Sequence, residues 1–311
     1  MNVSILIRQH WAALRALLVL TVITGFVYPL VVWGVAFLPG LHANAEGSII
    51  NVSGKSVGSK LIGQSFTDKD GDPLPQYFQS RPSAAGTGYD PLASGASNLG
   101  PENIVDTPAD PAKLAPGADP STAGFKPSLL TQVCSRSYAI GQLEKVDGER
   151  PFCTGGGVGA VLSVIGPRDS SGNVIHPTRV VSVNEPCSKP GTRPTTVFQQ
   201  FYEGVRVECA QYGQDYSAGR IVPIRGAAPD HPVVPADAVT ASASGLDPNI
   251  SPAYAQIQVA RVARVRGISI AQVRDAVHNN QHGRLLGFVG APQVNVLQLN
   301  LELDSKYPVK S

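Results

Sequence analysis

The chain has 311 residues, of which 15% are charged, and its formal net charge at pH 7 is +2. Nucleic-acid binding requires a basic patch with aromatic side chains, and nothing in this composition indicates nucleic acid as a partner. Glycine (32 residues) and proline (26 residues) are abundant, which predicts long loops.

Residues 16–38 form an apolar segment, ALLVLTVITGFVYPLVVWGVAFL, without a charged side chain. About 20 apolar residues suffice to cross a hydrocarbon core of about 30 Å, so this segment predicts a transmembrane helix. A cleaved signal peptide is the alternative, because Ala43, Asn44 and Ala45 resemble a signal-peptidase site. The apolar region of a signal peptide has about 7–15 residues, which favours an uncleaved anchor here.

The charges on either side of the segment predict its orientation. Arg8 and Arg15 precede it, whereas the first charged residue after it is Glu46. Basic residues stay on the cytoplasmic side of a membrane. We therefore expect residues 1–15 to be a cytoplasmic tail, and everything after residue 38 to lie outside the cytoplasm of a single-pass cell-membrane protein.

Small and hydroxyl side chains recur within the segment at helical spacing. Thr21, Thr24, Gly25 and Tyr28 fall on one face of a helix, which predicts packing against a partner helix. Pro29 removes a backbone hydrogen bond, so a kink near Gly25 is expected. The alternative is that threonine and glycine are simply frequent in membrane helices.

Residues 39–101 are interpreted as the first part of an extracytoplasmic domain. Short extended segments are expected at residues 48–52, 61–66 and 77–79, and a long loop at residues 80–101, which are rich in Gly, Ser, Asn and Pro.

Residues 231–311 are interpreted as the second part of the same domain. Ser251 followed by Pro252 predicts the start of a helix that ends at Gly267, and Ser269 with Gln272 predicts a second helix ending near residue 283. From residue 297 to residue 304, leucines alternate with polar residues, which predicts a final strand. The predicted fold class is α+β, with a sheet assembled from both parts of the domain.

Residues 102–230 differ in sequence pattern from the two parts of the domain on either side. They are interpreted as a β-rich insertion, a separate module that is partly dispensable. Residues 102–128 are typical of a linker, and strands are expected within residues 157–165, 179–183 and 201–209.

All four cysteines lie in this insertion, at Cys134, Cys153, Cys187 and Cys209. Their spacing does not suit zinc, whose cysteine ligands usually come in close pairs, whereas an extracytoplasmic location favours disulfides. Three pairings are possible. The order along the chain favours Cys134–Cys153 with Cys187–Cys209.

Residues with catalytic potential do not converge in the sequence. His278 and His282 lie four apart but have no third ligand nearby, so we expect a solvated surface and no metal site. No catalytic or cofactor-binding residue is predicted. The basic stretch is interpreted as a solvated face, with lipid headgroups or an acidic partner as the alternative; it comprises Arg261, Arg264, Arg266, Arg274 and Arg284.

Several stretches together resemble the KdpC family, the C subunit of the Kdp potassium-transporting P-type ATPase. They are TVITGFVYPL (21–30), GSKLIGQSF (58–66), YFQSRPSA (77–84), SGASNLGP (94–101), VPADAVTASASGLDPNISPAYA (234–255), RVARVRG (261–267) and LGFVGAPQVNVLQLNLELD (286–304). Two features depart from the family pattern: Gly95-Ala96 stands where a double glycine is usual, and residues 102–230 replace a much shorter connection that is found in many members.

The resemblance implies a non-catalytic accessory subunit that stabilises a high-affinity potassium uptake complex. The implied partners are a channel-like potassium-binding subunit, a P-type ATPase subunit and a small membrane subunit, which between them use ATP, Mg and K. It also implies a catalytic chaperone that assists ATP binding by the ATPase subunit. The alternative is a stand-alone membrane-anchored binding module or enzyme, which would need converging titratable residues.

Overall fold

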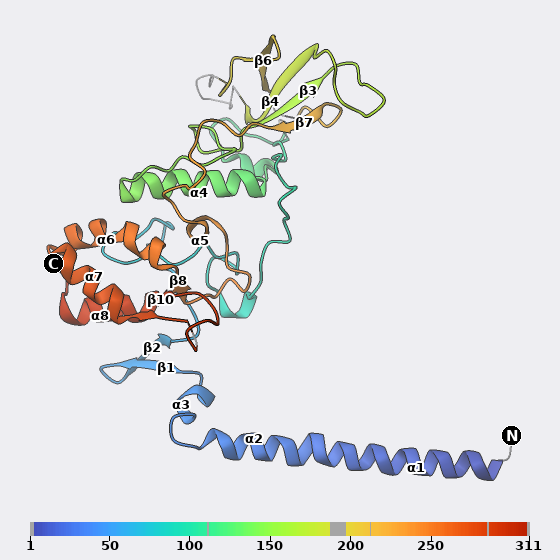
Figure 1. The fold of residues 1–311 in the computed structure, drawn as a ribbon, viewed down its shortest axis with the longest axis vertical. Coiled ribbons are helices and arrows are strands. Elements are labelled where there is room, and N and C mark those ends of the chain that lie inside the picture. The colour runs from blue at the N-terminus through green and yellow to red at the C-terminus, as the bar shows by residue number, and fades with distance from the viewer. Residues whose placement is uncertain (1–2, 111, 187–196, 212, 285, 310–311) are drawn as a thin grey trace. The chain divides into compact units, whose positions relative to one another are not determined.

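The computed structural model describes residues 3–110, 112–186, 197–211, 213–284 and 286–309. The chain forms two compact units, Met1–Ile62 and Gly63–Ser311 (Figure 1).

The first unit contains one long helix with a π-helical turn inside it. Its parts are α1 (Val3–Val22), η1 (Ile23–Val27) and α2 (Tyr28–Ala36). The 34-residue helix is long and apolar enough to cross a membrane, and none of its most apolar 18 residues is buried in the described chain. At 1.5 Å per residue it measures about 51 Å, longer than a hydrocarbon core of about 30 Å. The segment predicted as a cytoplasmic tail is therefore helical from Val3 onward.

A short helix and a hairpin complete the first unit. Helix α3 (His42–Ala45) precedes β1 (Ile49–Val52), which pairs with β2 (Lys55–Ser59) in an antiparallel, two-stranded sheet. Ser53 and Gly54 connect the strands with positive φ angles of 50° and 78°, as a tight hairpin turn requires. The strand predicted at residues 48–52 is confirmed.

Helices and a small sheet form the main core of the second unit. The helices are α4 (Leu129–Glu144), α5 (Ala236–Val239), α6 (Pro252–Arg266), α7 (Ile270–Asn279) and α8 (Val296–Lys306). The sheet has the order β8 (Asn249–Ile250), β10 (Gln293–Asn295), β9 (Gln281–His282), and all its pairings are antiparallel. Ser251 caps α6, and Ser269 with Gln272 forms a capping box at α7, as predicted.

The final strand predicted at residues 297–304 is wrong, because these residues belong to helix α8. Its buried residues follow helical spacing, with Val296, Leu299 and Leu303 fully buried in the main core. The Asn295 side chain accepts a hydrogen bond from Gln298 N at 3.0 Å and so caps the helix. The sequence signal of this cap is an asparagine followed three residues later by a glutamine. This signal outweighs the alternation of leucines with polar residues that suggested a strand.

The sheet predicted from both parts of the domain is also wrong. Strands β8, β9 and β10 all lie between residues 249 and 295, and β1 pairs only with β2 within the described sheets. Residues 61–66 and 77–79 contain no named strand in the described chain. Residues 80–101 form the predicted long loop, with one 3-10 turn, η2 (Pro91–Ala93).

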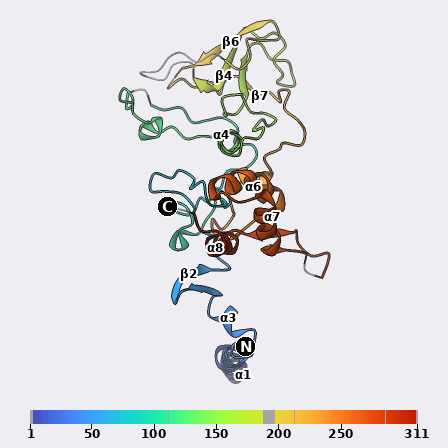
Figure 2. The same ribbon diagram turned by 90° about the vertical axis from the view of Figure 1, so that its left-hand side faces the viewer.

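The β-rich part predicted for the insertion is present as a five-stranded sheet at the opposite end of the second unit from β8–β10 (Figures 1 and 2). Its order is β5 (Phe201–Tyr202), β6 (Val205–Ala210), β4 (Arg179–Pro186), β3 (Val161–Ile165), β7 (Arg220–Pro223). Strands β4 and β6 are parallel and the other pairs are antiparallel. Leu162, Val164, Val180 and Val207 form its small apolar core.

Helix α4 was not predicted, and it does not belong to a separate module. Ser128 caps its first turn, and Val133, Ile140 and Val146 pack against the same core as α6. Before it, the predicted linker carries the 3-10 helix η3 (Pro120–Ala123) and a small buried cluster of Ala109, Leu114 and Ala123. The insertion therefore contributes part of the main core.

A disulfide joins Cys134 of α4 to Cys153, with 5.4 Å between their Cα atoms. This is the pairing that chain order favours. Cys187 lies outside the described residues, so the Cys187–Cys209 pairing stays a prediction.

Candidate functional site

The proposed partner-helix face lies at the π-helical turn of the first unit. Thr21 is in α1, Thr24 and Gly25 are in η1, and Tyr28 and Pro29 open α2. The Thr24 hydroxyl donates a hydrogen bond to the Leu20 carbonyl at 2.8 Å, so it is satisfied within its own helix. A Cβ added at Gly25 would meet no atom within 4 Å, which leaves an open surface there.

The π-helical turn changes how these five residues are arranged. A π-helical turn holds more residues than an α-helical turn, so Tyr28 is rotated relative to its position on a regular helix starting at Thr21. Proline near such a turn is expected, because the missing backbone donor is accommodated by local adjustment. The partner-helix face stays a prediction. Thr21, Thr24 and Gly25 keep the alignment expected of a regular helix better than Tyr28 does.

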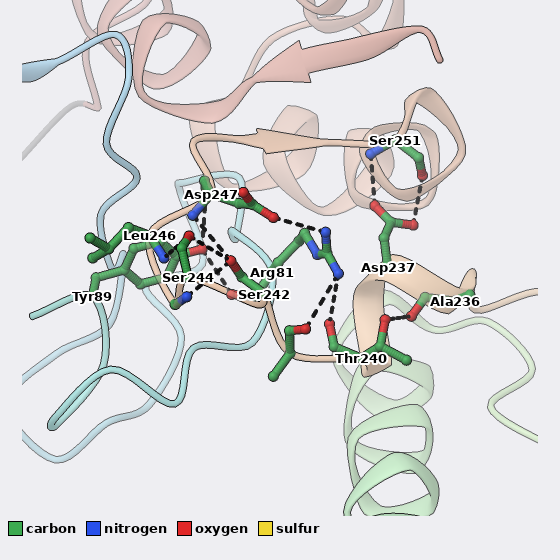
Figure 3. Close-up of polar contacts among 12 residues, drawn as sticks. Arg81, Tyr89, Ala236, Asp237, Thr240, Ser242, Ser244, Leu246, Asp247 and Ser251 are labelled. Carbon is green, nitrogen blue, oxygen red and sulfur yellow. Dashed lines mark hydrogen bonds and ion pairs between the residues drawn. The ribbon is translucent and has the colours of Figure 1, made fainter. Parts of the chain in front are cut away.

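In the second unit, two loops far apart in sequence are joined by polar contacts (Figure 3). The guanidinium of Arg81 donates to the Asp247 carboxylate at 2.9 Å and to the carbonyls of Thr240 and Ala241 at 3.4 and 3.5 Å. Ser242 N donates to the Pro82 carbonyl at 2.9 Å. The loop after residue 80 and the segment after α5 are thus held together as one polar junction.

Tyr89 lies at the centre of this junction. Its hydroxyl donates to the Arg81 carbonyl at 2.9 Å and lies 3.3 Å from the Asp247 carbonyl. Burial raises the pKa of Tyr89 to about 12, so it is a neutral hydrogen-bond donor at physiological pH. Gly245 has a φ of 71°, and a Cβ there would lie 2.5 Å from the Ala85 side chain, so the close approach of the loops requires glycine.

Asp237 connects the junction to helix α6. Its two carboxylate oxygens accept hydrogen bonds from Ser251 N at 2.7 Å and from the Ser251 hydroxyl at 2.8 Å (Figure 3). Ser251 is the N-cap of α6, so the carboxylate also lies near the positive end of the helix dipole. The start of α6 is therefore fixed relative to α5.

A cavity of about 350 Å³ lies beside the junction, lined by residues of the 80–89 loop and of α4, among them Arg81, Tyr89 and Arg136. Arg136 donates to the Val239 carbonyl at 2.9 Å and to Gln132 at 3.2 Å, and has no ion pair with a described carboxylate. Burial lowers the pKa of Arg136. The two guanidiniums therefore bind the consecutive carbonyls of residues 239–241.

A buried ion pair joins the insertion to the rest of the second unit. The side chains of Arg261 in α6 and Glu144 in α4 are 2% and 1% exposed, and their charged atoms lie 3.0 Å apart. Arg261 also donates to the carbonyls of Pro75 and Tyr77, at 2.6 and 2.9 Å, and to Gln258 at 2.9 Å. Burial raises the pKa of Glu144, and the hydrogen bonds from Arg261 oppose that shift.

Arg266 makes a second, half-buried arrangement at the end of α6. It donates to Asp304 at 2.8 Å and to the carbonyls of Gln76 and Tyr307, and its guanidinium lies 5.3 Å from the ring centroid of Tyr77. The interpretation of Arg261 and Arg266 as parts of a solvated face is therefore wrong. Both arginines hold the segment of residues 75–77 against the helices.

The described residues hold no group of three or more His, Cys, Asp or Glu able to bind a metal ion. His278 lies in α7 and His282 in β9. What the junction and the two arginine networks do is fix loops and helices relative to one another. With its long apolar helix, the chain has the features of a membrane-anchored protein.

Comparisons with known proteins identify the family. The sequence profile of KdpC, described as K+-transporting ATPase, c chain, matches residues 10–107 and 213–305. The Kdp ATPase KdpC subunit of Kineococcus radiotolerans is 35% identical over 303 residues, which cover 97% of this chain and 96% of the relative. The KdpC subunits of Beijerinckia indica and Koribacter versatilis are each 32% identical, over 298 and 291 residues that cover 96% and 94% of this chain. The chain belongs to the KdpC family of potassium-transporting ATPase subunits.

The profile leaves out residues 108–212, whereas the alignments with these relatives run across them. Relatives of similar length therefore carry a comparable segment.

Sequence reasoning missed the residues that make the networks. Arg81 and Asp247 lie within the stretches quoted for the resemblance, but nothing local marks them as a pair because 166 positions separate them. Glu144 does not lie in any of the stretches quoted for the resemblance, and helix α4, which carries it, was not predicted.

Proposed function

We propose that this chain is a non-catalytic accessory subunit that stabilises a high-affinity, ATP-driven potassium uptake complex. The observation that carries the proposal is the family match on both sides of the insertion, together with one candidate membrane span. An ion path needs a ring of oxygen ligands held by several elements, which a single span cannot supply. Transport and hydrolysis then belong to other subunits.

The partners are a channel-like potassium-binding subunit, a P-type ATPase subunit and a small membrane subunit. ATP, Mg and K are used by those subunits, and this chain needs no cofactor of its own. The residues around Thr21, Thr24 and Gly25 provide an open helix surface for a partner helix. The second unit provides a rigid contact surface fixed by its arginine networks.

The N-terminus lies in the cytoplasm and the second unit lies outside the cell membrane. Arg8 and Arg15 precede the apolar segment, and positive residues favour the cytoplasmic side. The catalytic-chaperone role, raising the ATP affinity of the ATPase subunit, then acts indirectly through the span. Such coupling requires that the ATPase subunit has two states that the span contacts differently.

Orientation is tested with single cysteines placed at Ser4 and at Ser305 in a chain without its native cysteines. An impermeant thiol reagent added to intact cells should label the cysteine at 305 and leave the one at 4 unlabelled. Labelling of the cysteine at 4 with protection of the cysteine at 305 would contradict the proposed orientation.

The transport role is tested by deleting the gene for this chain and measuring growth. Growth at very low potassium should be lost, growth at high potassium should be intact, and a plasmid copy should restore the former. Unimpaired growth of the deletion strain at very low potassium, with no second copy of the gene, would favour the stand-alone binding module or enzyme.

A further inference from the structure

The connection between β9 and β10 ends in an exposed apolar tip made of Leu286, Phe288 and Val289. Leu286 and Phe288 are 78% and 72% exposed, and Val289 is also exposed. Gly287 N donates to the Arg284 carbonyl at 3.1 Å, and Gly287 and Gly290 both have a φ of 82°. These turns make the connection reverse sharply, so the apolar side chains project into solvent instead of folding back onto the core.

The segment that forms the tip contains no acidic residue. From residue 276 to residue 301 the sequence has no Asp or Glu, and the charged residue next to the tip is Arg284. Residues 286–292 read LGFVGAP, so none of their side chains can form a hydrogen bond. Large apolar side chains exposed together on a folded domain mark a surface that is covered in the functional state.

We propose that this tip inserts into the headgroup–acyl boundary of the bilayer that the chain's own helix spans. A protein–protein interface surrounds its apolar centre with a polar rim and forms about one hydrogen bond per 100–200 Å². The tip offers apolar side chains and one cation, the combination that binds a lipid interface. Phe288 and Leu286 bury in the boundary region, and Arg284 contacts lipid phosphates.

Covalent attachment makes such a weak contact effective. The chain that carries the tip also carries the apolar helix, so insertion of the tip into the same bilayer is an intramolecular step. The inference depends on membrane anchorage and is independent of the transport role.

The first experiment measures lipid contact of the full-length chain reconstituted alone in vesicles. Trp11 and Trp33 are the only tryptophans, so replacing both with phenylalanine allows Phe288→Trp to report on the tip. Lipids brominated on the acyl chains should quench its emission, and aqueous acrylamide should not. Ile175→Trp is the matched control, because it is exposed in the β3–β4 connection, in the sheet at the other end of the second unit. It should be quenched by acrylamide alone.

The second experiment separates lipid from a protein occupant in the assembled complex. A photoreactive phenylalanine analogue at position 288 should form lipid adducts, identified by mass spectrometry. Crosslinks exclusively to another subunit would overturn the proposal, as would acrylamide quenching of Phe288→Trp without quenching by brominated lipid. Val289→Trp provides a second reporter if the first variant is poorly produced.

Discussion

Replacing Glu144 with alanine should be severely destabilising. The change leaves Arg261 charged and 2% exposed, without the carboxylate that now lies 3.0 Å from it. Removing one partner of a buried ion pair costs about 3–5 kcal/mol, because the remaining charge has lost its solvent and its counter-ion. That loss is a large part of the 5–15 kcal/mol by which folded domains are stable. Deleting residues 102–230 also removes Glu144, so we expect that deletion to destabilise the second unit as well, in contrast to the partial tolerance that the sequence suggested.

The measurement is urea denaturation of the purified chain in mild detergent, followed by far-UV circular dichroism. Glu208→Ala is the matched control, because Glu208 pairs with Arg179 at 2.9 Å but both side chains are about half exposed. Exposed pairs contribute about 0–1 kcal/mol, so this variant should stay close to the parent chain. Equal midpoints for Glu144→Ala and Glu208→Ala would refute the assignment of α4 to the main core.

Three further predictions address other parts of the chain. If Gly25 faces a partner helix, Gly25→Leu should lower the yield of intact complex in mild detergent while Val22→Leu does not; equal yields would remove the packed face. Replacing Cys134 and Cys153 with alanine should lower the free energy of unfolding by about 3 kcal/mol, since the bond closes a loop with a sequence separation of 19; an unchanged midpoint under non-reducing conditions would contradict this. Burial raises the pKa of Tyr89 to about 12, so its contribution to stability is complete below pH 10, where an unfolded tyrosine ionises, and is lost as the pH rises through 12. Tyr89→Phe should therefore flatten the fall in stability over this range, and identical pH profiles would count against a buried, neutral Tyr89.

Elements with local signals were predictable from the sequence. The apolar segment, the N-caps at Ser251 and Ser269 and the hairpin strand near residue 49 each rest on neighbouring residues. Helix α8 shows where such reasoning fails. Alternating leucines fit a strand, but the same leucines include positions 299 and 303, four apart, which a helix buries together once Asn295 caps it. Tertiary packing against the main core decided between the two patterns.

The networks were not predictable because their partners come from distant segments. Arg261 receives a carboxylate from α4, 117 positions earlier, and carbonyls from residues 75 and 77. Periodicity can place an arginine on a helix, but it cannot reveal that a distant loop will bury it. Five arginines in a short stretch therefore suggested a solvated face. In the structure, Arg261 and Arg266 are instead buried with specific partners.

The central claim, that this chain is required by a potassium-transporting ATPase, is tested most directly on the purified complex. The ATPase subunit is tagged and isolated from strains with and without this chain, and ATP hydrolysis is measured with and without potassium. We expect the chain to copurify with it, potassium-stimulated hydrolysis to need the chain, and the isolated chain to hydrolyse no ATP. Potassium-stimulated hydrolysis with unchanged rate and ATP affinity in the complex that lacks the chain would contradict the account.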